Sequence, residues 1–150
     1  MHSFPRRVAG FTLVEILTVL VVVAVLAALA IPAWHTHLLR MQRADAREAL
    51  IAVQSAQDKF FGAHARYAAG AEVSAPSPGG LALTVNSAHG FYHIEVQTSA
   101  DGLGYAASAR SVASGRQMED ARCAQFTLDQ NGRRRAVDSG GADRSADCWH

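Results

Sequence analysis

Three groups of residues have side chains that could support chemistry or ligand binding. Cys123 and Cys148 are the two cysteines of the 150-residue chain, and in an oxidising compartment such a pair forms one disulfide. Arg133, Arg134 and Arg135 make the one run of like charge. The seven histidines show no spacing that brings three or four metal ligands together, and there is no motif for a serine nucleophile, a zinc protease or a phosphate loop. The sequence therefore predicts no enzyme, no metal and no cofactor.

A fourth feature, Glu15, stands out because of its surroundings. Residues 11–31 are otherwise uncharged and strongly apolar, and as a helix they would be roughly 30 Å long, close to the hydrocarbon thickness of a bilayer. A carboxylate at the centre of a membrane helix costs up to about 2.5–3.5 kcal/mol on insertion scales, and less near the interface. Ionisable residues inside a membrane usually have a partner and a function, so we expect both for Glu15.

Two simple interpretations of the apolar run leave this carboxylate unexplained. Arg6 and Arg7 precede the run, so the positive-inside rule places this end in the cytoplasm. A cleavable secretory signal would fit the small residues ALA at positions 28–30, but the run is longer than a usual signal-peptide core. A plain single-pass anchor fits the length. Neither interpretation gives a reason for Glu15.

The segment GFTLVE, residues 10–15, follows a short basic leader and begins the apolar run. This arrangement resembles the class III signal of type IV pilins and pseudopilins. The resemblance implies that a prepilin peptidase cuts after Gly10 and that Phe11 becomes the N-methylated start of the mature chain. Glu15 then matches the family's glutamate, and Pro32 matches the proline that commonly bends the family's helix. The resemblance is close over about the first 35 residues.

In that family the glutamate meets the N-terminal amine of a neighbouring subunit. For this chain the resemblance implies an ion pair between Glu15 and the Phe11 amine of the next subunit. Each charge would remove the desolvation penalty of the other, so pairing would favour assembly in register. Close approach of the helices is helped by small residues in the run: Ala24, Ala27, Ala28 and Ala30.

The remainder of the chain predicts an α+β domain. The helix continues over residues 33–66, where apolar residues fall on one stripe at helical spacing: Leu39, Ala46, Leu50, Val53, Phe60 and Phe61. After a turn-rich linker at residues 74–80, strand candidates follow at residues 81–85, 91–98, 103–110 and on both sides of an Asn-Gly turn at residues 131–132. We expect a small antiparallel sheet that covers the helical stripe.

The arginine run is predicted to lie on the last hairpin of this sheet. Asp129 and Asp138 flank it, and we interpret it as a solvated strand edge that prevents edge-to-edge pairing. Alternate residues of a strand face opposite ways, so only Arg133 and Arg135 would share a face. No aromatic residue lies between them, so the pattern is a weak basis for DNA contact by Arg133 and Arg135.

We therefore predict a structural subunit of a type IV pilus. A looser likeness of residues 123–132 and 147–149 to minor pilins that prime or join the fibre favours a minor pilin. The expected parts are a cleaved leader (1–10), a transmembrane and assembly half of the helix (11–32), an amphipathic half (33–66) and a C-terminal β headpiece (67–150). The resemblance also supports the Cys123–Cys148 disulfide, because many pilins have a C-terminal disulfide-bounded loop.

Two alternatives within the family are a type II secretion pseudopilin and a DNA-binding pilin for transformation. Asp143 and Asp147 are too few acids for the calcium site of the major pseudopilin. The formal charge of +1 gives the whole chain no nucleic-acid footprint. A third alternative, a membrane-anchored enzyme, is not supported, because the sequence contains no catalytic constellation.

The resemblance also implies partners and a location. The partners are other pilin subunits through their N-terminal helices, the prepilin peptidase, the inner-membrane assembly platform and the inner membrane itself. The chain would cross the inner membrane once, with its C-terminal domain in the periplasm, and then enter an extracellular fibre. The fibre would support adhesion, twitching motility or DNA uptake.

Overall fold

The computed structural model describes residues 11–113 and 116–150, without the side chains of Pro32, Ala33 and Arg116. Helix α1 (Leu13–His64) is followed by strands β1 (Tyr92–Thr98), β2 (Tyr105–Ser111), β3 (Gln125–Asp129) and β4 (Arg134–Val137), and by the short helix α2 (Ser145–Cys148). The chain divides into two compact units, residues 1–37 and 38–150. The second unit includes the half of α1 that packs on the sheet. From here on, headpiece denotes the whole unit of residues 38–150, and not only the predicted β part at residues 67–150.

In the first unit, the large apolar side chains that the structure describes are exposed. Phe11, Leu13 and Leu29 are each at least 70% exposed, and the most apolar window of the helix is not buried at all. By length and composition α1 can cross a membrane. Pro32 lies within the helical range, so the helix assignment is continuous there.

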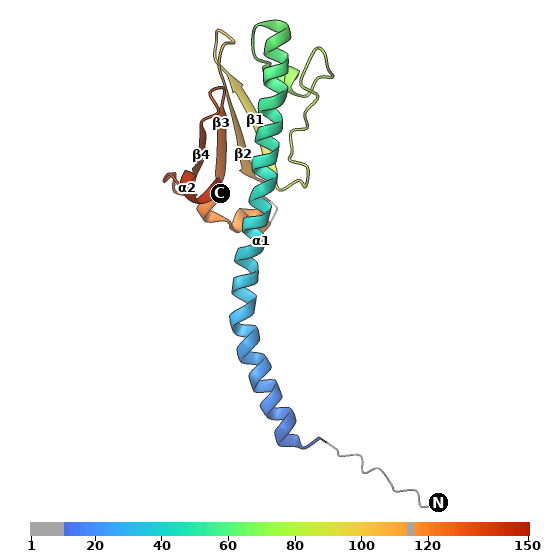
Figure 1. The fold of residues 1–150 in the computed structure, drawn as a ribbon, viewed down its shortest axis with the longest axis vertical. Coiled ribbons are helices and arrows are strands. Elements are labelled where there is room, and N and C mark those ends of the chain that lie inside the picture. Colours follow the sequence, from blue (N-terminus) through green and yellow to red (C-terminus); the bar gives the residue numbers. More distant parts are fainter. Residues whose placement is uncertain (1–10, 114–115) are drawn as a thin grey trace, which may run out of the picture. The chain divides into compact units, whose positions relative to one another are not determined.

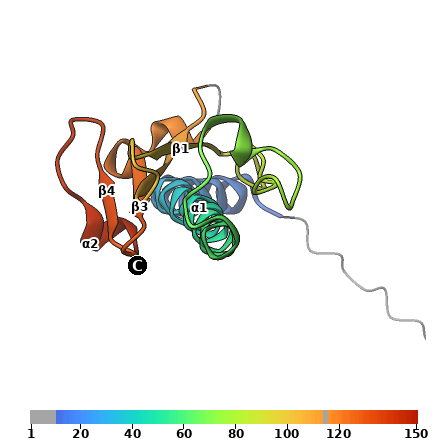
Figure 2. The ribbon, with the colours of Figure 1, turned by 90° about the horizontal axis from the view of Figure 1, so that it is seen from above.

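The headpiece sheet is an antiparallel meander in the order β1-β2-β3-β4, which confirms the predicted fold class. The sheet lies along one side of the second half of α1, and the connection between α1 and β1 runs along another side (Figures 1 and 2). Side chains alternate across each strand, so one face of the sheet is buried against the helix. On β1, for example, Tyr92 and Ile94 are buried, whereas His93 and Glu95 are exposed.

The core is built from the helical stripe and the inner face of the sheet. Its buried residues are Ala46, Leu50, Val53, Tyr92, Ile94, Tyr105, Ala107, Ala109, Cys123, Phe126, Leu128, Ala136 and Cys148. The aromatic members pack edge to face, with ring centroids 5.8 Å apart for Tyr92 and Phe126. Four of the six predicted stripe residues are buried, and Leu39 and Phe61 at its ends are partly exposed.

The expected strand at residues 81–85 does not form. The amide of Leu81 donates to the carbonyl of Glu72 at 2.9 Å, and the amide of Leu83 donates to Val73 at 3.0 Å. These donors are therefore used by the preceding loop and are not available to a neighbouring strand. Ala82 also has a φ of 52°, which interrupts an extended conformation. Val85 does reach the sheet, because its carbonyl accepts from the amide of Ile94.

Candidate functional site

The β3–β4 hairpin presents the arginine run to solvent. Its turn is closed by Asp129, whose Oδ1 accepts hydrogen bonds from the backbone amides of Asn131 at 2.9 Å and Arg133 at 3.0 Å. Gly132 has a φ of 71°, a conformation that Asn-Gly turns favour. Asp129 thus shapes the turn and does not form an ion pair with the arginines. Among the described residues, no ion pair involves Arg133, Arg134 or Arg135, and all three side chains are exposed.

The strand register separates the arginines onto two faces, as predicted. Arg134 lies opposite Leu128, a core residue, and so belongs to the side of the sheet that faces α1. Arg135 lies opposite Thr127 on the outer face. The outer face also includes Arg110 of β2, which pairs in register with Gln125 of β3. Arg110 and Arg135 are both exposed, so this face has two positive charges two strands apart.

An aromatic ring from the end of the chain joins the arginine run. The guanidinium carbon of Arg134 lies 5.4 Å from the centroid of the Trp149 ring, a cation–π contact. The indole Nε1–H of Trp149 donates to the carbonyl of Arg135 at 2.9 Å. The ring also meets Phe126 edge to face, at 5.8 Å between centroids. The aromatic partner that the run lacks in sequence is therefore supplied by the tertiary structure.

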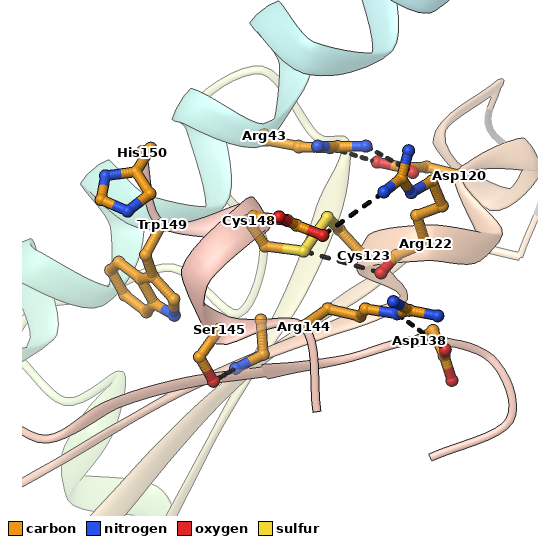
Figure 3. Close-up of a disulfide and its surroundings, with 12 residues drawn as sticks. Arg43, Asp120, Arg122, Cys123, Asp138, Arg144, Ser145, Cys148, Trp149 and His150 are labelled. Carbon is orange, nitrogen blue, oxygen red and sulfur yellow. Dashed lines mark hydrogen bonds and ion pairs between the residues drawn. A yellow bond between two sulfur atoms is a disulfide. The ribbon is translucent and has the colours of Figure 1, made fainter. Parts of the chain in front are cut away.

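The Cys123–Cys148 disulfide holds this terminal segment in place. The two Cα atoms are 5.9 Å apart, and both cysteines are buried (Figure 3). The disulfide expected from the sequence is confirmed. Arg47 of α1 adds a second tie, because its guanidinium donates to the carbonyl of His150 at 2.6 Å. Trp149 thus lies between two fixed points.

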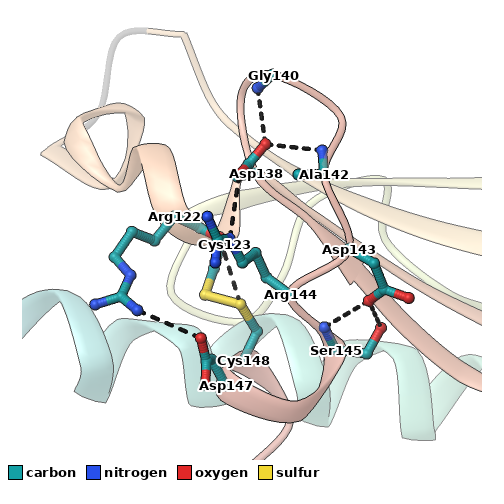
Figure 4. A network of polar contacts seen from close by, with 10 residues as sticks. All are labelled: Arg122, Cys123, Asp138, Gly140, Ala142, Asp143, Arg144, Ser145, Asp147 and Cys148. Carbon is teal, nitrogen blue, oxygen red and sulfur yellow. Dashed lines mark hydrogen bonds and ion pairs between the residues drawn. A yellow bond between two sulfur atoms is a disulfide. The ribbon is translucent and has the colours of Figure 1, made fainter.

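The loop between β4 and α2 is closed by its own carboxylates (Figure 4). Asp138 Oδ1 accepts from the amides of Gly140 and Ala142, both at 2.9 Å, and its Oδ2 accepts from Arg144 Nε at 3.2 Å. The Ala142 hydrogen bond, together with the Arg144 and Gly140 hydrogen bonds, lowers the pKa of Asp138. Asp143 accepts from the amide and the hydroxyl of Ser145. Both carboxylates therefore accept hydrogen bonds from within the loop and stabilise its conformation.

Two buried polar clusters tie α1 to the rest of the headpiece, and sequence reasoning missed both. Asp120 accepts two hydrogen bonds from Arg43, at 2.6 and 2.9 Å, and its side chain is only 3% exposed. Asp45 accepts from Ser87 Oγ at 2.5 Å and from the backbone amide of His89 at 3.2 Å. In the sequence both acids resemble surface residues, because nothing in their local pattern marks them as buried.

The environment of Asp45 favours its charged form. Burial alone would raise the pKa of this carboxyl, but hydrogen bonds from Ser87, His89 and Phe91 outweigh it and lower the pKa below its ordinary value. Ser87 links Asp45 to β1, because its hydroxyl also accepts a hydrogen bond from the backbone amide of Tyr92 at 3.0 Å. The start of β1 is therefore anchored to α1 through one carboxylate.

Within the described ranges, no group of three or more His, Cys, Asp or Glu side chains could hold a metal ion. The polar clusters above join structural elements, and their carboxylates are occupied by hydrogen bonds within the chain. The arginines of the β3–β4 hairpin and of the outer sheet face lie outside these clusters. They are exposed positive groups whose guanidinium donors could bind an anionic ligand.

Comparison with known families identifies this architecture. A family profile described as "Type IV minor pilin ComP, DNA uptake sequence receptor" matches residues 32–127, which is most of the chain beyond the apolar run. The chain belongs to this family of type IV minor pilins. A second profile, the prokaryotic N-terminal methylation motif, matches residues 5–31. The expected pilin membership and the minor-pilin function are therefore confirmed.

Single proteins give a more limited picture of the relationship. The pilin is 36% identical over 67 residues to the type IV major pilin protein PilA of Myxococcus xanthus (strain DK1622). That match covers 45% of this chain and 30% of the relative, so the pilin spans about a third of the length of the relative it matches. A solved type IV pilin from Shewanella oneidensis is 23% identical, with a TM-score of 0.47 over 64% of this chain and 89% of that one.

The N-terminal features predicted for the minor pilin stay predictions. Gly10 lies outside the described residues. Phe11 is exposed, and in the first turn of the helix the backbone amide of Glu15 donates to Thr12 Oγ1 at 3.2 Å. No described residue forms an ion pair with the Glu15 carboxylate. The methylation profile and the apolar helix support membrane anchoring and assembly with other pilins.

Proposed function

We propose that this minor pilin binds DNA through its headpiece while its N-terminal helix holds it in a type IV fibre. The observation that supports DNA binding is the β3–β4 hairpin, where three exposed arginines form no ion pair with a described carboxylate. Unpaired guanidinium groups at a strand edge suit phosphate oxygens, which they bind through paired N–H donors. We therefore prefer a DNA-binding surface to the earlier interpretation of the arginine run as a solvated strand edge.

The outer sheet face extends this surface. Arg110 and Arg135 lie on the same face two strands apart, which is roughly 10 Å across the sheet at the usual strand spacing. Glu95 is an exposed acid on the same face, but it belongs to β1 at the opposite edge. Arg110 lies on β2 next to β1, whereas Arg133, Arg134 and Arg135 lie at or beside β4, so a phosphate backbone would lie along the β4 edge.

The family description supports the same function, since the matching profile names a DNA uptake sequence receptor. The matched range ends at residue 127, before the arginine run. Arg133, Arg134 and Arg135 are therefore assigned to the DNA surface by their exposure and charge alone, and they are the part of the proposal that an experiment must test first.

The test is a DNA titration of the full chain in neutral-lipid nanodiscs at several salt concentrations. About three phosphate contacts predict a slope of log K against log salt of roughly −2.7. Replacing Arg133, Arg134 and Arg135 together by Ala should weaken binding and flatten the slope towards zero. Arg135→Ala removes one charge of the hairpin, and Lys59→Ala, which removes one exposed positive charge from α1, is its matched control. Equal affinity and slope in the wild type and the triple variant would remove the hairpin from the DNA surface.

The N-terminal unit is proposed to act as in other pilins. A prepilin peptidase cuts between Gly10 and Phe11, Phe11 is N-methylated, and Glu15 pairs with the Phe11 amine of a neighbouring subunit. Residues 11–32 pack among other pilin helices, Pro32 bends the helix, and residues 67–150 lie outside the inner membrane. Mass spectrometry of the N-terminus in sheared fibres tests the cleavage. A mature start at Ile31 would point instead to an ordinary secretory signal.

A further inference from the structure

We propose that Trp149 is a stacking site for an unpaired nucleobase, which replaces the Arg134 guanidinium over the indole ring while Arg134 turns to a phosphate. This inference rests on the DNA binding proposed above and adds a specific ligand group to it. It would give the headpiece a preference for nucleic acid with accessible bases over closed duplex.

The first support is that the ring is fixed before any ligand arrives. Its Nε1–H is bound to the Arg135 carbonyl at 2.9 Å, and Phe126 meets it edge to face. The neighbouring Cys148 is in the disulfide, and the carbonyl of His150 accepts from Arg47 at 2.6 Å. A ring that is already oriented loses little conformational entropy when a base stacks on it.

The second support is that the present occupant of the ring can leave. Arg134 is exposed, lies 5.4 Å from the ring centroid, and belongs to no ion pair among the described residues. Cation–π contacts at exposed sites are weak, whereas a guanidinium that binds a phosphate gains a charged partner. Exchange of Arg134 for a base therefore converts one weak contact into a stack and an ion pair.

The third support is the position of the ring at the β4 edge. Arg134 and Trp149 lie on the helix-facing side of the sheet, and Arg135 lies on the outer face. Arg135 joins the two sides, because its backbone carbonyl holds the indole and its side chain faces outwards. A nucleotide at this edge can place its base on Trp149 and its phosphate near the arginines. Stacking platforms beside basic residues are how proteins commonly bind single strands.

The experiment measures Trp149 fluorescence in the full chain with Trp34→Phe, in neutral-lipid nanodiscs, because Trp34 is the only other tryptophan. An oligodeoxythymidylate should quench Trp149, whereas an abasic oligomer of the same length and charge should bind without quenching. A blunt duplex of equal length should quench much less than the single strand. Arg134→Gln should keep the quenching and lower the magnitude of the salt slope by about one.

Trp149→Phe provides the matched loss of stacking area. It keeps an aromatic ring against Phe126 but loses the indole hydrogen bond to Arg135, so the headpiece should stay folded and unfold at a modestly lower temperature. Its affinity for the thymidylate oligomer should fall roughly tenfold relative to its affinity for the abasic oligomer, as expected for one weakened base stack.

The outcomes separate the two proposals. Equal binding of the thymidylate and abasic oligomers with unquenched Trp149 would make the ring a structural anchor only, and the DNA-binding function would stand. Stronger quenching by the duplex than by the single strand would also overturn the stacking site. Absence of binding by every oligomer at low salt would overturn both the stacking site and the DNA-binding function.

Discussion

The two units of this pilin differ in where their apolar side chains lie. In residues 11–37 the apolar side chains lie outside, as with Val14 at 66% and Leu29 at 70% exposure. In residues 38–150 a core of large apolar side chains lies inside, as with Leu50 and Phe126 at 0%. The headpiece therefore has its own core, whereas the N-terminal unit obtains its stabilisation from lipid or from other helices.

Charge follows the same division. In the headpiece the buried Asp120 is paired with Arg43 and bonded to Gln117, so its desolvation is compensated inside one chain. In the first unit the Glu15 carboxylate forms no ion pair among the described residues. We therefore expect the Glu15 carboxylate to be compensated only in the assembled fibre, whereas Asp120 is compensated within the folded subunit.

The sharpest test of this contrast is Glu15→Ala, for which we expect the largest effect. The subunit should remain inserted in the membrane with a folded headpiece, because removing a carboxylate lowers the cost of the helix in lipid. Its entry into fibres should fall roughly a hundredfold to several-thousandfold, which corresponds to about 3–5 kcal/mol for the amine left unpaired. The measurement compares the membrane fraction with sheared fibres.

Two variants bracket this prediction. Glu15→Gln should lie between the wild type and Glu15→Ala, since it keeps the size and a hydrogen-bond acceptor. Glu48→Ala removes an exposed carboxylate from the same helix in the headpiece and should enter fibres normally. Wild-type incorporation of Glu15→Ala would show that charge pairing is not what recruits the subunit.

Arg43→Met should have the opposite signature and destabilise the headpiece alone. It leaves Asp120 buried without its cation, which typically costs about 3–5 kcal/mol in the free energy of unfolding. Arg40→Met, at an exposed position of the same helix, should change it by less than about 0.5 kcal/mol. Denaturant unfolding followed by near-UV circular dichroism measures both. An equal effect of the two variants would mean that the buried pair contributes nothing specific.

Removing the disulfide by Cys123→Ser with Cys148→Ser should cost roughly 3 kcal/mol, from the entropy of the closed loop in the unfolded chain. The sequence separation of 25 residues sets this value. Thermal unfolding of the headpiece should shift downwards, while membrane insertion stays unchanged. A headpiece of undiminished stability without the bridge would mean that Arg47 and the Asp138 loop hold the terminal segment by themselves.

Acid should weaken the headpiece through Asp45. Because hydrogen bonds hold the pKa of the folded carboxyl below its ordinary value, its stabilisation is complete above the unfolded pKa of about 3.9 and is lost as the pH falls through the folded pKa. The free energy of unfolding should therefore drop less between pH 5 and pH 3 in Asp45→Asn than in the wild type. Identical pH profiles would exclude Asp45 as an acid-sensitive anchor.

The smallest effect is expected for Arg133→Ala with Arg135→Ala. Both side chains are exposed and form no ion pair among the described residues, so the free energy of unfolding should change by less than about 0.5 kcal/mol. Fibre entry should also be unchanged. A clear loss of either would show that the hairpin has a structural role besides the proposed DNA contact.

Local patterns in the sequence determined much of this molecule. The apolar run is continuous, and its length indicates a helix that can span a membrane. The helical stripe and the alternation along Tyr92–Thr98 are periodic, and the period of such a pattern indicates which face of the element is buried. The Asn131-Gly132 turn and the opposite faces of Arg134 and Arg135 followed from the same local rules. The cysteine pair followed from a count of two and an expected oxidising compartment.

Only the tertiary structure decided where polar and aromatic side chains meet. Arg43 and Asp120 are 77 positions apart, and Trp149 reaches Arg135 over 14. The predicted strand at residues 81–85 likewise does not form because its backbone amides donate to the preceding segment. Such contacts have no period and no fixed spacing, because they depend on how separate elements pack, and a sequence specifies that packing only through the whole fold.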